Sequence, residues 1–392
     1  MSAAIYLDHF ATTPLDERVL DAMLPYFRDH FGNPSSDGHH IGQRAKLAVE
    51  KARDVIRRAV GCQSERGVLF TSGATESNNL LIRGLSESFG IYRRHLVVGA
   101  IEHKSVLEPI NWLSTRGYRV TRVPVNGSGL IDPSLVAKAI TPDTLLVSIM
   151  AVNNEVGSIQ PLQQIGALVK AHGVLFHCDA AQGVGKVPID MSRCPIDFLS
   201  VSAHKIYGPK GVGALCVAHE EPERYLTSQL LGGGQEYGLR SGTLNVPGIV
   251  GLAKAIEVTN LEAESESERI RKLRDRLKGK LEANIEGINI NGDPDRSIPG
   301  ALNVSIAGVR STAILARIQH IAVSGAAACG GQSAKSHVLT AMGFDRERVQ
   351  SALRFCVGRF NTVGEIDSAV ERIATEVAWI RNQPVFGEAQ AS

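Results

Sequence analysis

Residues 197–217 read DFLSVSAHKIYGPKGVGALCV, in which two apolar runs flank a loop of polar residues and glycines. DFLSVS and GALCV are short and apolar, which is typical of buried strands. Working outward along the chain, similar runs recur between stretches of helical spacing, at 67–72, 95–100, 144–150 and 174–179. Continuous apolar strands that alternate with helices predict an α/β fold whose mostly parallel sheet is covered on both faces.

The character of the sequence changes near residue 250. A long charged helix is predicted over 251–284, and shorter segments follow it, among them ALNVSIAG, RSTAILARIQH, ALRFCVG and EIDSAVERIATEVAWI. This mixture suits a smaller α+β domain. We therefore expect a large domain over 16–257 and a small domain formed by 1–15 together with 258–392.

Composition and charge exclude several classes of protein. The 392 residues suffice for two domains, and 42 lysines and arginines nearly balance 40 aspartates and glutamates. A net charge of +2 lacks the basic surplus that marks direct nucleic-acid or membrane-surface binding. No apolar run approaches the roughly 20 residues that cross a bilayer. The six cysteines lack zinc-site spacing, so we expect no metal centre, reduced thiols and a cytoplasmic location.

Reactive side chains follow five of the predicted strands. Ligands of open α/β sheets bind at the carboxyl ends of strands. Those positions hold TSGAT (71–75), EHK (102–104), NNE (153–155), Asp179 with Gln182, and SAHK (202–205). Any one of these groups is ordinary loop polarity, but all five together predict a functional site at this edge of the sheet. Residues 71–75 also open a helix, so their N–H groups and hydroxyls form a candidate anion site.

Lys205 and Asp179, each at the end of a predicted strand, are the residue types that bind an aldehyde cofactor with a pyridine ring. A lysine just past a strand end can form a Schiff base with an aldehyde cofactor. An aspartate about 26 residues earlier, on a neighbouring strand, can hold a pyridine nitrogen protonated. The pair therefore predicts pyridoxal 5′-phosphate, with the phosphate at the helix start near residues 72–75.

VSAHKIYGPKGVGAL closely resembles the cofactor-lysine segment of NifS/IscS-like cysteine desulfurases, which belong to the class V aminotransferase family of pyridoxal-phosphate enzymes. Nine further blocks resemble the family in the same order, over roughly residues 5–375: IYLDHFATTP, GNPSS, FTSGATESNN, IEHKSVL, VNNEVGSIQP, HCDAAQGVGKVPID, GGGQEYGLRSGTLN, SGAAAC and LRFCVGRF. The resemblance implies fold type I, with a seven-stranded, mostly parallel sheet in the cofactor-binding domain. It also implies that the small domain carries the loop of the nucleophilic cysteine.

The same resemblance implies a role for each matching residue. Lys205 forms the Schiff base, Cys329 is the nucleophile, and His103 stacks on the cofactor ring and transfers protons. As an imidazolium, His103 would also favour the thiolate of Cys329. The implied cofactor-binding residues are Ala74, Thr75, His103, Asn154, Asp179, Gln182, Ser202, His204, Lys205 and Thr243.

Substrate binding and assembly follow from the resemblance as well. Arg354 matches the arginine that pairs with the substrate carboxylate, helped by Asn33, and the nearby Arg359 competes for that role. Thr243 matches a residue that reaches the phosphate of the other subunit, which implies a homodimer with shared sites.

The implied activity converts L-cysteine to L-alanine and leaves a persulfide on Cys329. An acceptor protein, either an iron–sulfur scaffold or a thiolation factor, would then receive the sulfur. Gly330 and Gly331 stand where many members have threonine or serine, so acceptor choice stays open and includes DNA phosphorothioation. The alternatives are a selenocysteine lyase, a cysteine C–S lyase without a protein nucleophile, and a non-catalytic partner that holds the cofactor and docks an acceptor.

Overall fold

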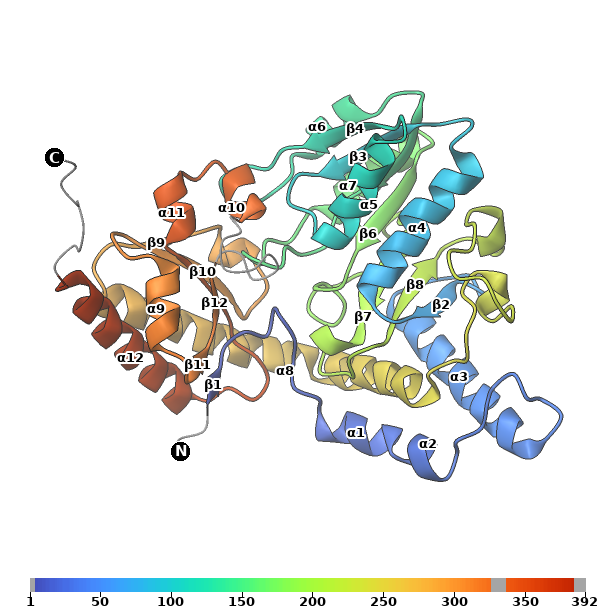
Figure 1. Cartoon of the computed structure of the whole chain (residues 1–392), viewed down its shortest axis with the longest axis horizontal. Coiled ribbons are helices and arrows are strands. Elements are labelled where there is room, and N and C mark those ends of the chain that lie inside the picture. The colour runs from blue at the N-terminus through green and yellow to red at the C-terminus, as the bar shows by residue number, and fades with distance from the viewer. Residues whose placement is uncertain (1–3, 326–335, 384–392) are drawn as a thin grey trace, which may run out of the picture.

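The structure is a computed structural model that describes residues 4–325 and 336–383. Its larger part is built around a seven-stranded sheet with the strand order β2-β8-β7-β6-β5-β3-β4 (Figure 1). These strands are β2 (Val68–Thr71), β3 (His95–Gly99), β4 (Arg119–Val123), β5 (Thr144–Ser148), β6 (Leu175–Asp179), β7 (Phe198–Ser202) and β8 (Gly213–Val217). β8 runs antiparallel to both neighbours, and the other pairs are parallel. The predicted α/β class with a mostly parallel sheet is confirmed.

Helices make up much of the rest of the described chain. They are α1 (Glu17–Met23), α2 (Pro25–Arg28), α3 (His40–Ala59), α4 (Ala74–Phe89), α5 (Lys104–Ser114), α6 (Pro133–Ala139), α7 (Leu162–Ala171), α8 (Val246–Asn284), α9 (Ser311–Arg317), α10 (His337–Ala341), α11 (Arg346–Gln350) and α12 (Val363–Arg381). Within the described residues, none of these helices combines the length and the apolar character that a membrane crossing requires.

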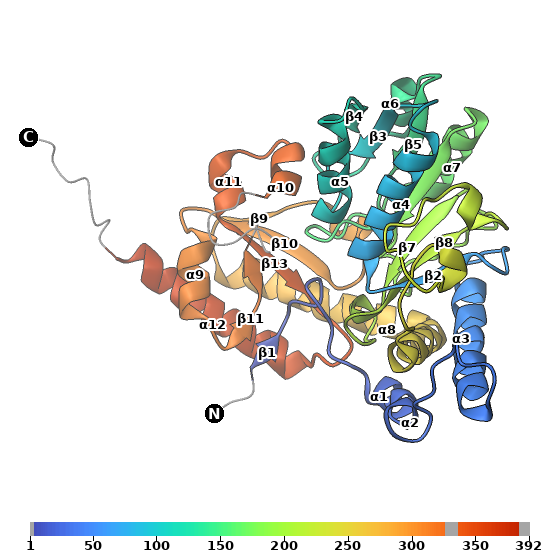
Figure 2. The same cartoon turned by 45° about the vertical axis from the view of Figure 1, so that its right-hand side comes forward.

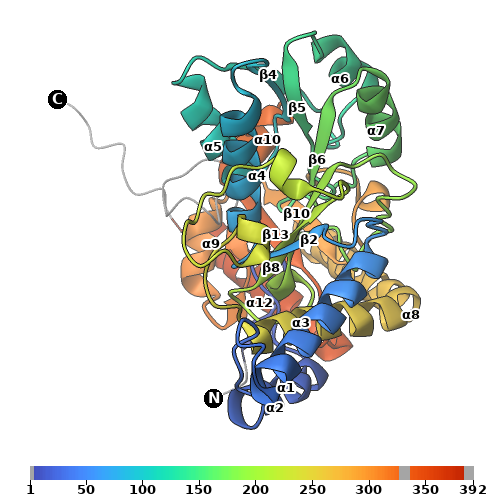
Figure 3. The same cartoon turned by 90° about the vertical axis from the view of Figure 1, so that its right-hand side faces the viewer.

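Alternate residues of the strands face opposite layers of helices. In β3, Val97 packs into a core that includes α3, α6, α7 and the start of α8. Leu96 and Val98 pack into a second core, with α4 and α5. In Figure 3, β5 and β6 lie between α5 on one side and α6 and α7 on the other. Burial on both faces explains why these strands are continuous apolar runs.

A second, smaller sheet has the strand order β12-β13-β10-β9 and is antiparallel. Its core contains residues of α9, α12 and the second half of α8. A two-stranded parallel ladder joins the N-terminal β1 to β11. The strands of this region are β1 (Ile5–Tyr6), β9 (Ile288–Ile290), β10 (Ala301–Ile306), β11 (Ile321–Ala322), β12 (Ser324–Gly325) and β13 (Ala352–Cys356).

Helix α8 connects the two parts of the molecule. Ile249 and Ile256 pack into the core of the large sheet, whereas Leu273, Leu277 and Leu281 pack into the core of the small one. Figures 1 and 2 show α8 passing beneath both sheets. A domain boundary at residue 257, inside this helix, stays a prediction.

Two elements differ from the sequence-based expectation. β4 was not predicted, because it is an edge strand in which Val123 alone is buried, and its arginines interrupt the apolar run. α8 begins at Val246 rather than at residue 251, because the Asn245 side chain accepts from the N–H of Gly248 and caps the helix there. Such a cap is a short-range signal that apolar periodicity does not reveal.

Candidate active site

A cavity of about 640 Å³ lies where the carboxyl ends of the central strands meet the small sheet. Residues that follow β3, β5, β6 and β7 line it, together with the first turn of α4, and β12 and β13 contribute Ser324 and Arg354. We call this space the strand-end cavity. Ten residues singled out from the sequence line it: Ala74, Thr75, His103, Asn154, Asp179, Gln182, Ser202, His204, Lys205 and Arg354.

Lys205 ends a single 3-10 turn that directly follows β7. Its Nζ donates to the backbone oxygens of Phe10, at 2.6 Å, and Ala11, at 2.8 Å. Both acceptors belong to the segment after β1, so the N-terminal chain helps to orient a side chain of the large sheet. The two carbonyl groups hold the amine that we expect to form the Schiff base within the cavity.

Asp179 is the last residue of β6 and is only 4% exposed. Its Oδ1 accepts from the N–H of Ala181 at 3.0 Å, and its Oδ2 accepts from Nδ2 of Asn78 at 2.9 Å. These donors fix the direction of the carboxylate. An oriented, buried carboxylate at the cavity wall suits the predicted contact with a protonated pyridine nitrogen.

His103 caps the N-terminus of α5. Its Nδ1 accepts from the N–H of Ser105 at 3.1 Å and lies 2.8 Å from the Ser105 hydroxyl. Burial lowers the pKa of the imidazole, although Asp179 opposes this shift. Because Nδ1 acts as an acceptor, the neutral ring carries its proton on Nε2. Burial thus favours the neutral ring at rest, and the imidazolium expected from the sequence stays a prediction.

Ala74 and Thr75, in the first turn of α4, form a candidate phosphate site together with Ser202 and His204 at the end of β7, and we call these four residues the phosphate cup. Among the described residues, no side chain caps this helix, so its first N–H groups can bind an anion. The preceding Gly73 has φ +146°, a conformation that residues with side chains rarely adopt. Burial lowers the pKa of His204 to about 4, so its ring is neutral near pH 7.

Gln182 and Asn154 add polar groups to the cavity wall. Nε2 of Gln182 donates to the Phe10 oxygen at 2.9 Å, and the backbone oxygen of Asn154 accepts from Arg354 at 3.1 Å. Both residues therefore lie in the same cavity as Lys205. Their contact with a phenolic oxygen of the cofactor stays a prediction.

The structure distinguishes the two arginines that are candidates for binding the substrate carboxylate, because Arg354 lines the strand-end cavity and Arg359 does not. Arg354 is 2% exposed and donates from Nη2 to Oδ1 of Asp8 at 2.8 Å. Its buried Nε has no hydrogen-bond partner among the described residues. An unsatisfied buried donor costs about 1–3 kcal/mol, and a carboxylate in the cavity would satisfy it. Arg359 does not line the cavity and is bound at both ends of its fork by Glu266, at 2.8 and 2.9 Å.

Three predicted residues are not brought into this cavity. Asn33 is exposed before α3, where its Oδ1 accepts from the N–H of Ser35 at 3.0 Å. Thr243 is exposed in the loop before α8. Neither residue lines the strand-end cavity of the single chain. Cys329 lies outside the described residues.

Sequence reasoning missed residues that hold the site together. Asp8, which forms a β-bridge with Cys356 of β13, orients Arg354 of the same strand, and Ser324 donates to Oδ2 of Asp8 at 2.6 Å. Asn78 orients Asp179. The sequence did contain a signal for Asp8, because this carboxylate directly follows the apolar run over residues 5–7, as functional residues often follow a strand. The others are isolated polar residues, and only their tertiary contacts reveal what they do.

The residues present fit pyridoxal 5′-phosphate. The phosphate cup offers backbone N–H groups beside a glycine that leaves the helix start uncovered, and the buried carboxylate of Asp179 is available for the ring nitrogen. Lys205 supplies the amine for the aldehyde. The donor set thus matches a phosphate, a pyridinium and an aldehyde in one cavity of sufficient size.

Comparison with known proteins agrees with this chemistry. The family model described as aminotransferase class-V matches residues 5–368. A protein named cysteine desulfurase IscS from Anaeromyxobacter sp. (strain Fw109-5) is 46% identical over 382 residues, which cover 97% of this chain and 94% of the relative. A protein of the same name from Rickettsia bellii (strain OSU 85-389) is 46% identical over 379 residues, covering 96% and 92%.

Solved structures give the same result. A NifS-like protein superposes with a TM-score of 0.90 at 38% identity, covering 96% of this chain and all of the other. DndA from Streptomyces lividans has a TM-score of 0.77 at 40% identity, with coverages of 91% and 99%. A structure described as SspA in complex with cysteine has a TM-score of 0.80 at 35% identity, with coverages of 91% and 100%. The chain therefore belongs to the aminotransferase class-V family, whose members use pyridoxal 5′-phosphate.

Proposed function

We propose that the protein is a cysteine desulfurase, which converts L-cysteine to L-alanine and forms a persulfide on Cys329. The observation that carries this proposal is the strand-end cavity, where Lys205, Asp179 and Arg354 converge from three strands of two sheets. The relatives named cysteine desulfurase and the neighbour described with bound cysteine support the same substrate.

The substrate is held at its carboxylate. Arg354 offers its buried Nε to that group, while Asp8 and the Asn154 oxygen keep the guanidinium in place. A fixed carboxylate places Cα of the bound cysteine toward the amine of Lys205, and Lys205 takes the Cα proton. When bound, pyridoxal 5′-phosphate supplies an electron sink for this step. The neutral imidazole of His103 is a base, so it can return a proton to the substrate only after it has taken one up as an imidazolium.

Sulfur leaves by attack of the Cys329 thiolate on the sulfur of the bound cysteine. The carbon–sulfur bond breaks, a sulfur–sulfur bond forms, and Cβ gains a proton. One cysteine and one protein thiol therefore give one alanine and one protein persulfide. The acceptor of that sulfur is a protein, and an iron–sulfur scaffold and a thiolation factor are both compatible with the site.

Shared sites in a homodimer are part of the proposal. Thr243 lies on an exposed loop outside its own cavity, which suits a residue that serves a second subunit. The loop is anchored to its own chain at two points. Arg240 donates to Glu76 at 2.7 Å, and the buried Glu236 accepts from Arg53 at 2.8 Å. A loop held in this way is organised before it meets a partner.

The products formed from L-cysteine test the proposed activity. Purified protein loaded with pyridoxal 5′-phosphate and a reducing agent should yield equal amounts of alanine and sulfide. Pyruvate instead of alanine would identify a C–S lyase. A rate with selenocysteine far above that with cysteine would identify a selenocysteine lyase. If neither amino acid is converted, the remaining interpretation is a non-catalytic partner that holds the cofactor and docks an acceptor.

Arg354→Ala should raise KM for cysteine far more than it alters cofactor retention. Losing a charge-assisted contact with a carboxylate in a desolvated site costs about 2–4 kcal/mol, or about 30- to 1000-fold in KM. Steady-state kinetics and a cofactor titration of the variant measure the two effects. The matched control is Arg359→Ala, which should destabilise the protein but change KM little, because Glu266 binds Arg359 away from the cavity. A larger KM effect for the Arg359 variant would contradict the assignment.

A further inference from the structure

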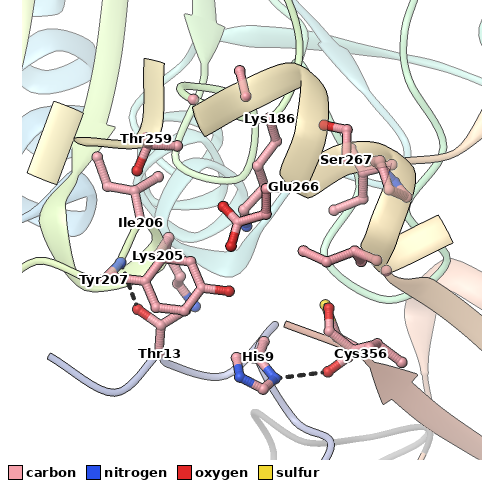
Figure 4. Close-up of a pocket in the computed structure, with 17 residues that line it drawn as sticks. His9, Thr13, Lys186, Lys205, Ile206, Tyr207, Thr259, Glu266, Ser267 and Cys356 are labelled. Atoms are coloured by element: carbon pink, nitrogen blue, oxygen red, sulfur yellow. Dashed lines mark hydrogen bonds between the residues drawn. The ribbon is translucent and has the colours of Figure 1, made fainter. Parts of the chain in front are cut away.

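A second, smaller cavity of about 60 Å³ lies next to the strand-end cavity, and Lys205 lines both. Figure 4 shows Lys186 lining this small cavity together with Lys205, Glu266 and Cys356. Lys186 has no part in the mechanism above. It is nonetheless a second amine close to the amine that is expected to bind the cofactor, and its contacts lead back into the strand-end cavity.

Lys186 contacts the cofactor site through Gln182. Its Nζ donates to Oε1 of Gln182 at 2.7 Å, while Nε2 of Gln182 donates to the Phe10 oxygen at 2.9 Å. The same Phe10 oxygen accepts from Nζ of Lys205 at 2.6 Å. Lys186, Gln182, the Phe10 carbonyl and Lys205 thus form one continuous chain of hydrogen bonds between the two lysines.

These contacts assign the oxygen and the nitrogen of the Gln182 side-chain amide. An ammonium can only donate, so it requires the amide oxygen, and the Phe10 carbonyl can only accept, so it requires the amide nitrogen. The amide nitrogen has a second N–H, and Gln182 lines the strand-end cavity. Gln182 therefore presents a donor to a bound ligand, and Lys186 acts together with the Phe10 carbonyl to prevent the amide from turning its oxygen toward that ligand.

Within residues 4–325 and 336–383, no carboxylate pairs with Lys186 to neutralise its charge. Its acceptor is an amide oxygen, and the carboxylate of Glu266 is bound by Arg359. Cys356, from β13, has a pKa raised by burial to about 11 and is a neutral thiol.

Three further groups around the small cavity and its neighbour are uncharged. Burial lowers the pKa values of His9 and His204 to about 4, and it raises the pKa of Tyr207. Burial also lowers the pKa of Lys186 itself, to about 8, so the amine is mostly charged near pH 7. A positive group without a carboxylate partner favours a negative group nearby.

We propose that Lys186 is a positioning residue of the cofactor site, which holds Gln182 so that its amide donates to the anionic ring oxygen of pyridoxal 5′-phosphate. This inference rests on the proposed function, because it assumes that the cofactor binds in the strand-end cavity. Lys186 acts through Gln182 and touches neither substrate nor cofactor.

A double-mutant cycle of Lys186→Met and Gln182→Ala tests the proposal. Each apoprotein is titrated with pyridoxal 5′-phosphate, and the visible absorption of the bound cofactor is followed against pH. Lys186→Met should weaken cofactor binding roughly ten-fold, the size expected for one charge-assisted hydrogen bond. The pH midpoint of the absorption should rise, because the variant removes a positive charge from the cavity beside the cofactor site and a positive charge opposes protonation nearby. In the Gln182→Ala background, Lys186→Met should weaken binding little further.

The controls separate this role from a structural one. Lys170→Met makes the same chemical change at an exposed position of α7 and should leave binding and midpoint unchanged. Lys186→Arg retains a donor and should bind the cofactor within about three-fold of the original protein. An equal loss of affinity from Lys186→Met with and without Gln182 would overturn the proposal, as would a loss in Lys186→Arg as large as that in Lys186→Met. Failure of the unmodified protein to bind the cofactor at all would instead overturn the proposed function.

Discussion

Cys329→Ser should abolish persulfide formation and lower alanine formation by several orders of magnitude. A hydroxyl of ordinary pKa is a far poorer nucleophile toward sulfur than a thiolate. The variant should still bind the cofactor, and its visible spectrum should still respond to cysteine, because neither event uses the thiol. Mass spectrometry of the protein after incubation with cysteine should find the additional sulfur on the peptide that contains Cys329.

The other cysteines supply the control. Cys62, Cys178, Cys216 and Cys356 are buried, and burial raises the pKa of the half-buried Cys194 thiol to about 11. Cys194→Ser should therefore keep full activity, since its thiol is mostly protonated near pH 7. Normal turnover by Cys329→Ser, with pyruvate as the product, would show that the protein is a lyase and that the loop cysteine is incidental.

Lys205→Ala should remove the visible absorption of the cofactor-loaded protein and lower turnover by at least about 1000-fold. The variant loses both the amine that forms the Schiff base and the group that takes the Cα proton. Its fold should persist, because Lys205 lies just past the end of β7 and its Nζ donates to the backbone oxygens of Phe10 and Ala11, which remain in place in the variant. Absorption spectra with and without added pyridoxal 5′-phosphate measure the loss.

Lys205→Arg is the matched variant for this second prediction. It keeps a cation that can donate to the Phe10 and Ala11 oxygens, but a guanidinium does not form the Schiff base under these conditions. It should therefore be as colourless and as inactive as the alanine variant. Absorption that survives in either variant would mean that another amine attaches the cofactor. Lys186, which lines the neighbouring small cavity, would then be the first residue to test.

The two variants also bear on the assignment of His103. Burial lowers the pKa of His103, which favours a neutral ring that acts as a base until it takes up a proton. If it returns a proton to the substrate, its loss should affect alanine formation while leaving the cofactor spectrum intact. The Lys205 variants should lose both, because the same amine serves attachment and proton removal.

The sequence by itself determined the fold class and identified the candidate residues that line the strand-end cavity. Strands buried on both faces are continuous apolar runs, and this pattern is local, so it can be detected without coordinates. The reactive residues of a parallel sheet follow its strands, and β5, β6 and β7 bring Asn154, Asp179 and Lys205 to one cavity as expected. The edge strand β4 escaped detection because only one of its faces needs apolar residues.

Only the tertiary structure decided which residues act through others. Arg354 and Arg359 lie five positions apart and are indistinguishable as residue types, but one faces the cavity beside Asp8 and the other is bound by Glu266. The contact of Lys186 with Gln182 is local in sequence. Its link to Lys205, however, passes through the Phe10 carbonyl, which lies 172 positions from Gln182. Side-chain direction and burial arise from packing between distant segments, and no local pattern of residues encodes them.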